Sequence, residues 1–157
     1  MKWLINKIVG SKNQRELKKL GVIVNKINEL EAEFQSLSDD QLKSKTSEWK
    51  EKLKSFETDL DANIEDWKNK EINKLLRPTN DEIKDIEEKS RIRKIDGLEE
   101  VYDKQSEYLN EILPQAYAVV KNGARRMVGK SYTVCDQPME WDIIHFDCQL
   151  KGGIALH

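Results

Sequence analysis

The chain is poor in the residues that interrupt or cross-link a fold. Its 157 residues include 2 Cys, 3 Pro and 7 Gly, which excludes a disulfide framework and leaves few positions for tight turns. It also lacks any run of eighteen apolar residues and any signal-peptide core, so the sequence predicts neither a membrane span nor the usual kind of export signal. Such sparse cysteine usage favours a reducing compartment.

Charge is abundant instead. Charged residues make up 36% of the chain and hydrophobic residues 38%, a balance typical of long solvent-exposed helices rather than of a compact α/β core. The charge is also unevenly distributed: residues 1–20 carry a net +5, residues 21–113 a net −8 and residues 114–157 a net +1. The basic end and the acidic middle are therefore expected to have different partners.

Residues 1–10 form a short amphipathic segment with an aromatic residue near its start. One helical face is apolar and the other is polar and basic, which suits a membrane surface that contains anionic lipid. Docking of the apolar face on the rest of the protein is an equal alternative. If the segment binds a membrane, we expect the contacts to come from Lys2, Trp3, Leu4, Ile5, Lys7 and Ile8.

Residues 11–56 are predicted to form a helical hairpin. Capping boxes at Ser11 with Gln14 and at Ser38 with Gln41 mark two helix starts. The first helix carries an apolar stripe at helical spacing, made of Leu20, Ile23, Ile27, Leu30, Phe34 and Leu37. The second carries a similar stripe, made of Leu42, Thr46, Trp49, Leu53 and Phe56. Packing of the two helices on each other is favoured over a partner-binding coiled coil, because two or three heptads are few for the latter.

Residues 57–111 are expected to form an exposed, charged helical arm. Pro78, followed by a capping box at Thr79 and Glu82, restarts a helix within it. The charge density favours an arm without chemistry, and docking of a partner protein is left open.

Residues 112–157 change character. Pro114 is predicted to be the first residue of a new helix that ends at Gly129. Residues 130–135 then have strand-like composition, and a turn is predicted at residues 136–138. Near the end, Gly152 and Gly153 are expected to form a turn in a packed site.

Two motifs in this region are decoys. Residues 124–131 resemble a phosphate loop, but a working loop follows a strand and opens a helix, whereas here a helix is predicted before it and a strand after it. All the Cys and His residues fall within 23 positions, but they lack the paired short spacing of structural zinc sites: Cys135, His145, Cys148 and His157. We therefore predict no metal site, and expect Cys148 to be a small buried hydrophobe.

Three stretches, in the same order, resemble the SecA family of ATP-driven preprotein translocases. They are Leu37-Ser38-Asp39-Asp40-Gln41-Leu42-Lys43-Ser44-Lys45-Thr46, Ile112-Leu113-Pro114-Gln115-Ala116-Tyr117-Ala118-Val119-Val120-Lys121 and His145-Phe146-Asp147-Cys148-Gln149-Leu150-Lys151-Gly152-Gly153. The resemblance implies a mainly α fold of long amphipathic helices, with a short β and loop segment at residues 112–157 that begins the first RecA-like nucleotide-binding domain. It also makes residues 57–111 an insertion.

The resemblance implies ATP as cofactor, with Gln149 in the adenine-recognising Q motif. A carboxamide has one acceptor and two donors in a plane, so it can pair with an adenine edge. Phe146 is expected to shape the base pocket or, more simply, to pack in the core, and Asp147 to order the local loop. The phosphate loop and the Mg²⁺ ligands are expected beyond His157, so we predict no catalytic residue and no ATPase activity for these 157 residues alone.

The implied partners are the Sec translocon channel, preproteins and an acidic phospholipid surface, with a homodimer also allowed and no nucleic acid. The implied location is cytoplasmic, peripheral on the inner face of the inner membrane. The alternative hypothesis is a non-enzymatic helical adaptor that binds an acidic membrane or a partner protein. A reading frame that continues past His157 into a Gly-Lys-Thr segment would favour the motor, and a stop codon there the adaptor.

Overall fold

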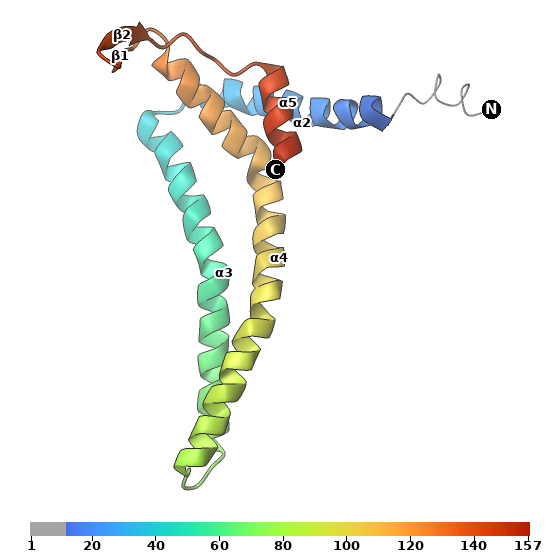
Figure 1. Ribbon diagram of the computed structural model, residues 1–157, viewed down its shortest axis with the longest axis vertical. Coiled ribbons are helices and arrows are strands. Elements are labelled where there is room, and N and C mark those ends of the chain that lie inside the picture. Colours follow the sequence, from blue (N-terminus) through green and yellow to red (C-terminus); the bar gives the residue numbers. More distant parts are fainter. Residues whose placement is uncertain (1–11) are drawn as a thin grey trace, which may run out of the picture. The chain divides into compact units, whose positions relative to one another are not determined.

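The computed structural model describes residues 12–157, which form four helices and two strands (Figure 1). In chain order these elements are α2 (Lys12–Phe34), α3 (Asp39–Asn73), α4 (Asn80–Met127), β1 (Ser131–Val134), β2 (Gln137–Glu140) and α5 (Asp147–Leu156). The predicted mainly α fold with a short β segment near its end is confirmed. Within the described residues, no helix has the length and apolar character needed to cross a membrane.

The chain divides into two compact units. Among the described residues, unit 1 consists of residues 12–42 together with residues 112–157, and unit 2 consists of residues 43–111. α3 and α4 each contribute to both units, and the units are described separately below.

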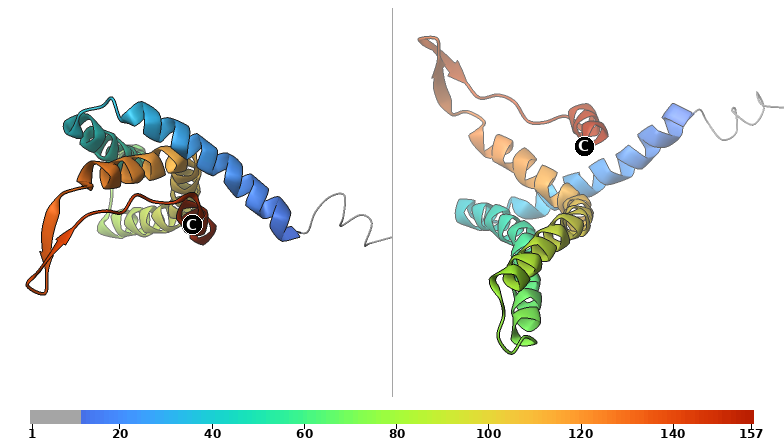
Figure 2. Two further views of the ribbon diagram at one scale, coloured as in Figure 1. Left: turned by 90° about the horizontal axis from the view of Figure 1, so that it is seen from above. Right: turned by 60° about the horizontal axis from the view of Figure 1, so that its bottom comes forward.

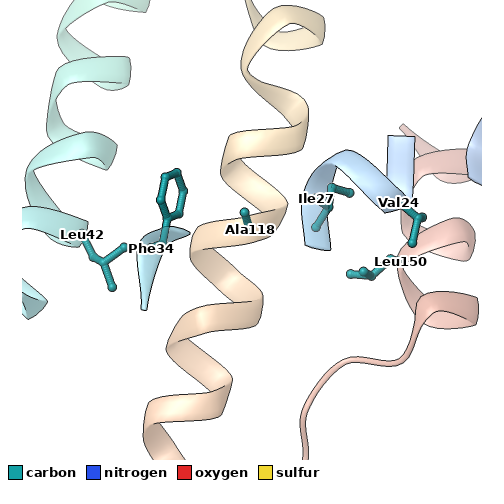
Figure 3. Packing of buried hydrophobic residues seen from close by; sticks show 6 residues of the cluster. All are labelled: Val24, Ile27, Phe34, Leu42, Ala118 and Leu150. Atoms are coloured by element: carbon teal, nitrogen blue, oxygen red, sulfur yellow. The ribbon is translucent and has the colours of Figure 1, made fainter. Parts of the chain in front are cut away.

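The core of unit 1 collects side chains from four helices (Figure 3). Ile27 and Phe34 of the apolar stripe predicted for the first helix are buried here, together with Val24, which the prediction did not include. Partly buried Ile23, Leu30 and Leu37 extend the same cluster. Its buried members are Val24, Ile27 and Phe34 of α2, Leu42 of α3, Ala118 of α4 and Leu150 of α5.

Both capping boxes that fall within the described residues are confirmed. Ser38 Oγ accepts a hydrogen bond from the Gln41 N–H at 3.2 Å, and Gln41 Oε1 accepts one from the Ser38 N–H at 2.8 Å. Thr79 and Glu82 pair in the same way at the start of α4. These bonds satisfy N–H groups that have no partner within the helix, and so fix where α3 and α4 begin.

The helix predicted to start at Pro114 does not start there. α4 runs without a break through Pro114, which lies inside it. A proline in a helix interior removes one backbone hydrogen bond and costs about 3 kcal/mol. Here the helix persists because Ile112 and Leu113 before the proline and Ala118 after it are all buried, so packing outweighs the lost bond.

The strand-like segment forms an antiparallel hairpin, β1 with β2, and an extended segment leads from it back to α5 (Figure 2). Its turn lies one position earlier than predicted: Cys135 and Asp136 have φ of 48° and 60°, and Val134 pairs with Gln137. Two positive φ values are the geometry of the tight two-residue turns that suit strand twist. Pro138 therefore belongs to β2, where a two-stranded sheet leaves an outer edge that tolerates it.

In unit 2, α3 and α4 pack through their apolar stripes. The ring of Phe56 meets that of Tyr108 edge to face at 6.2 Å, and the guanidinium of Arg93 lies 4.4 Å from the centre of the Trp67 ring. Lys94 forms an ion pair with Asp61 at 2.7 Å. Of the stripe predicted at residues 42–56 to pack on the first helix, Leu42 does so in the core of unit 1, whereas Phe56 packs on Tyr108 of α4.

Candidate functional site

The start of α5 carries the residue predicted to recognise adenine. Phe146 precedes the helix in an extended conformation, with φ −78° and ψ 155°. The side chain of Gln149 turns back, and its Oε1 accepts a hydrogen bond from the Phe146 N–H at 2.9 Å. Gln149 thus acts as the third residue of a capping arrangement and fixes the point at which the helix begins.

This hydrogen bond also fixes which way the carboxamide points. Only its oxygen can accept from an N–H group, so a flipped amide would lose the bond and place two donors together. Gln149 is exposed, and its Nε2 donates no hydrogen bond within the described part of the chain. The side chain therefore presents two N–H donors and a second oxygen lone pair to solvent in a set orientation.

The neighbours of Gln149 differ from expectation. Phe146 is 70% exposed, so the prediction that it packs in the core is wrong. Cys148 is exposed as well, which corrects its prediction as a buried hydrophobe. In this part of the chain it is Leu150, 3% exposed, that packs in the core instead.

The glycine pair is not a turn. Gly152 and Gly153 both lie inside α5, which continues to Leu156. A Cβ on Gly153 would come within 2.7 Å of the Tyr117 hydroxyl oxygen, whereas a Cβ on Gly152 would meet nothing. Gly153 therefore lets α5 approach α4 closely. Two glycines weaken a helix by themselves, but this packing stabilises α5, and the prediction of a turn is wrong for that reason.

Asp147 orders the start of α5 through two other helices. Its Oδ1 accepts a hydrogen bond from Asn28 Nδ2 of α2 at 3.1 Å and lies 3.7 Å from Lys121 Nζ of α4. Lys121 Nζ also donates to Asn28 Oδ1 at 2.6 Å. We call Asn28, Lys121 and Asp147 the α5 anchor. The sequence analysis did not find the first two, because they lie 119 and 26 positions from Asp147.

A second polar cluster surrounds Glu31, which is only 3% exposed. Arg125 donates to both of its carboxylate oxygens, from Nε to Oε1 at 2.7 Å and from a terminal nitrogen to Oε2 at 3.1 Å. Asn122 Nδ2 donates to Glu31 Oε1 at 3.1 Å, and Gln35 Nε2 donates to Glu31 Oε2 at 3.4 Å. Burial raises the pKa of Glu31, but these hydrogen bonds outweigh it and the net pKa is lowered. The hydrogen bonds to Glu31 and its negative charge in turn raise the pKa of Arg125.

Arg126 extends this cluster to the end of α2. Its guanidinium donates to the backbone oxygens of Phe34 and Leu37 at 3.0 and 2.6 Å, and to Asp39 Oδ1 at 2.6 Å. Arg125 and Arg126 thus donate hydrogen bonds to carboxylate and backbone carbonyl groups of the protein itself. The segment resembling a phosphate loop, residues 124–131, has the predicted order of a helix followed by a strand.

Metal-ligating residues are dispersed. Within residues 12–157, no group of three or more His, Cys, Asp or Glu side chains is placed to hold a metal ion. Cys135 and Cys148 are free thiols, and His145 Nδ1 is buried with no hydrogen-bond partner in the described region. The predicted membrane contacts lie outside the described residues and stay a prediction: Lys2, Trp3, Leu4, Ile5, Lys7 and Ile8.

Comparison with known proteins assigns a class to this arrangement. The family model described as the SecA DEAD-like domain matches residues 5–157, nearly the whole chain. The match places this helical arrangement, with an exposed glutamine at the start of α5, in the class of SecA DEAD-like domains.

The protein translocase subunit SecA of Chloroherpeton thalassium is 44% identical over 154 residues, and that of Chlorobium limicola is 39% identical over 156 residues. Each alignment covers 98% of this chain and 14% of the relative, so the chain spans about a seventh of the length of these relatives. The chain belongs to the SecA family of protein translocase subunits. No solved structure matches it.

Proposed function

We propose that this chain is the amino-terminal part of an ATP-driven SecA motor and supplies the adenine-recognising side of its nucleotide site through Gln149. The observation that carries the proposal is the orientation of the Gln149 carboxamide, whose oxygen is held by the Phe146 N–H at 2.9 Å. An exposed amide with one fixed orientation is prepared to pair with one kind of base edge.

The base edge that it fits is that of adenine. The free N–H donors of Gln149 match the ring acceptor N7, and the second lone pair of its oxygen matches the amino group on C6. Guanine carries an acceptor oxygen at C6, and this oxygen would lie opposite the acceptor oxygen of Gln149 unless the amide flipped. Flipping would break the bond to Phe146, so the site would favour adenine. The exposed Phe146 ring lies at the same helix start and could cover one face of the base.

Phosphate and Mg²⁺ chemistry falls to other parts of such a motor. Mg²⁺ supplies charge neutralisation on the phosphates when bound. From the resemblance to the family, we propose that other parts of the motor supply the phosphate loop and the Mg²⁺ ligands, and that these 157 residues alone hydrolyse no ATP.

Two substitutions in the complete motor test the adenine assignment. Gln149→Glu keeps a carboxylate oxygen for the Phe146 N–H but removes both donors, whereas Gln149→Ala removes both functions. We expect Gln149→Glu to weaken ATP binding by about 10- to 100-fold, the usual worth of a two-bond base contact, while α5 stays folded. Titration with a fluorescent ATP analogue measures the affinity, and circular dichroism checks the fold. Unchanged ATP affinity in a folded Gln149→Glu variant would refute the assignment.

The wider role follows from the family. We propose that the motor acts with the Sec translocon on preproteins, and that the basic segment at residues 1–10 contacts acidic phospholipid at the cytoplasmic face of the inner membrane. Vesicle flotation with anionic and neutral lipid tests this contact. Replacing Lys2 and Lys7 by Glu should abolish flotation with anionic vesicles, and equal flotation of variant and wild type would exclude it.

A further inference from the structure

We infer that Lys121 and Asn28 are specificity-determining positioning residues for the adenine site, acting through Asp147 on Gln149. The inference rests on the proposed function of Gln149 and extends it to residues that do not touch the nucleotide. Its basis is the α5 anchor, which ties the first turn of α5 to α2 and α4 two positions before Gln149.

Lys121 is an unusual residue for a helix interface. The residue is 8% exposed, and burying an ammonium group is costly unless its donors find partners. Its Nζ donates a hydrogen bond to Asn28 Oδ1 at 2.6 Å and forms an ion pair, without a direct hydrogen bond, with Asp147 Oδ1 at 3.7 Å. An apolar side chain in this place could stabilise the interface as well or better, so stability alone does not account for a lysine here.

The α5 anchor adds directional contacts to the apolar packing of α5. The packing of Leu150 and the close approach of Gly153 to Tyr117 hold α5 against its neighbours, but apolar contacts are non-directional and tolerate small rotations. The hydrogen bond from Asn28 to Asp147 and the nearby charge of Lys121 set the rotation of α5 about its axis. Asp147 itself is favoured at this position by the positive end of the helix dipole.

The rotation of α5 matters because base recognition is geometric. Asp147 and Gln149 lie in the same helical turn, so a shift of the Asp147 carboxylate moves Gln149 as well. A recognition side chain must be held within about 0.5 Å of its productive place to keep its discrimination. Loosening the anchor should therefore weaken adenine preference before it unfolds the helix.

The test uses Lys121→Met in the complete motor, because methionine keeps the length of the side chain and removes the ammonium. We expect ATP affinity to fall about 5- to 10-fold while weak GTP binding changes little, so that the preference for ATP over GTP falls with it. Lys121→Arg should restore most of the preference, since a guanidinium can reach both Asn28 and Asp147. Lys104→Met is the matched control on the same helix, because Lys104 pairs only with Glu100 one turn away at 2.7 Å.

A second background separates positioning from general stability. In a Gln149→Ala motor, Lys121→Met should have almost no further effect on ATP binding, because the side chain that it positions is gone. An equal loss of ATP and GTP binding, or a full effect in the Gln149→Ala background, would show that Lys121 only stabilises the fold and would overturn the inference. If instead Gln149→Glu itself leaves ATP binding unchanged, the proposed function fails first, and the two failures are distinguishable. Should Lys121→Met not fold, Asn28→Ala, which removes the hydrogen bond to Asp147 from a half-buried position, replaces it in both backgrounds.

Discussion

The two units of this chain use charge in opposite ways. In unit 1, polar side chains are buried and join segments distant in the sequence, as when Arg125 of α4 holds Glu31 of α2. In unit 2, charged side chains are exposed and pair mostly within one helix turn, as do Lys70 with Asp66 and Lys104 with Glu100. Among the buried residues of the described chain, only Ile86 and Val101 belong to unit 2.

This difference fits the recognition role proposed for unit 1 and the expectation that residues 57–111 form a charged arm without chemistry. Exposed pairs within a helix contribute little each, about 0.3–0.5 kcal/mol, and fix nothing beyond that helix. Buried pairs between helices fix how α2, α4 and α5 lie against one another inside unit 1, at the cost of desolvating the charges. A recognition site needs such fixed geometry, whereas an arm does not.

The first prediction concerns the core on which unit 1 depends. Leu150→Ala removes a side chain that is 3% exposed from the junction of α2 and α5, and should destabilise unit 1 by about 2–5 kcal/mol. Leu156→Ala, on the same helix but 90% exposed, should change stability by less than about 0.5 kcal/mol. Hydrogen exchange measured by mass spectrometry reports each unit separately. Loss of protection in unit 2 as large as that in unit 1 would show that the two are not distinct in stability.

The second prediction contrasts one arginine from each unit. Arg125→Ala leaves the buried carboxylate of Glu31 without its two-bond partner and should cost about 2–3 kcal/mol, less than a fully buried pair because the Arg125 side chain is 41% exposed. Arg91→Ala removes an exposed pair with Glu88 in unit 2 and should cost less than about 0.5 kcal/mol. Urea unfolding of both variants gives the comparison. Equal midpoints would mean that burial of the Glu31 pair adds nothing.

The third prediction uses pH. Because the folded-state pKa of Glu31 lies below the ordinary value of 4.5, its ionised form contributes stability at neutral pH that is lost as the pH falls through the folded pKa. Wild type should therefore be more stable than Glu31→Gln at pH 7, and the difference should shrink as the pH falls below 4.5 and through the folded-state pKa.

Melting temperatures of the two proteins across that range measure the effect. Glu33→Gln, on the exposed side of the same helix turn, serves as the control. A difference between wild type and Glu31→Gln that is constant with pH would contradict the prediction.

How much of this the sequence predicted depends on the range of each interaction. The stripe of α2 and the capping boxes at Ser38 and Thr79 were predicted correctly, since they are set by residues within one or two turns. The helix break at Pro114 and the turn at Gly152 and Gly153 were wrong. In both places local preference is overruled by packing against another helix, which a single sequence does not show.

The candidate site follows the same division. Gln149 was predicted from a family resemblance, but its hydrogen bond to Phe146 was not. Asp147 was expected to order its local loop, but its partners in the α5 anchor and the whole Glu31 cluster were missed. Asn28 and Glu31 are ordinary polar residues of an amphipathic helix until α4 and α5 are placed beside them. Periodicity identifies buried apolar positions, but it gives no sign of which polar residues are buried with them.

The smallest predicted effect tests how closely α5 is packed, with two adjacent glycines in the same helix. Gly152→Ala places its Cβ in open space, so the lower entropy of alanine should stabilise unit 1 by about 0.5–1 kcal/mol. Gly153→Ala has the same intrinsic gain, but its Cβ would meet the Tyr117 hydroxyl, and a ring packed against the core cannot withdraw without loss elsewhere. We expect a net loss on the order of 1 kcal/mol, so the two variants should differ in sign when measured by urea unfolding. In unit 2, Gly97→Ala faces the flexible end of the half-buried Leu60, which can move, and should lie between them. If Gly153→Ala were as stabilising as Gly152→Ala, α5 would not be held as closely as its role in positioning Gln149 requires.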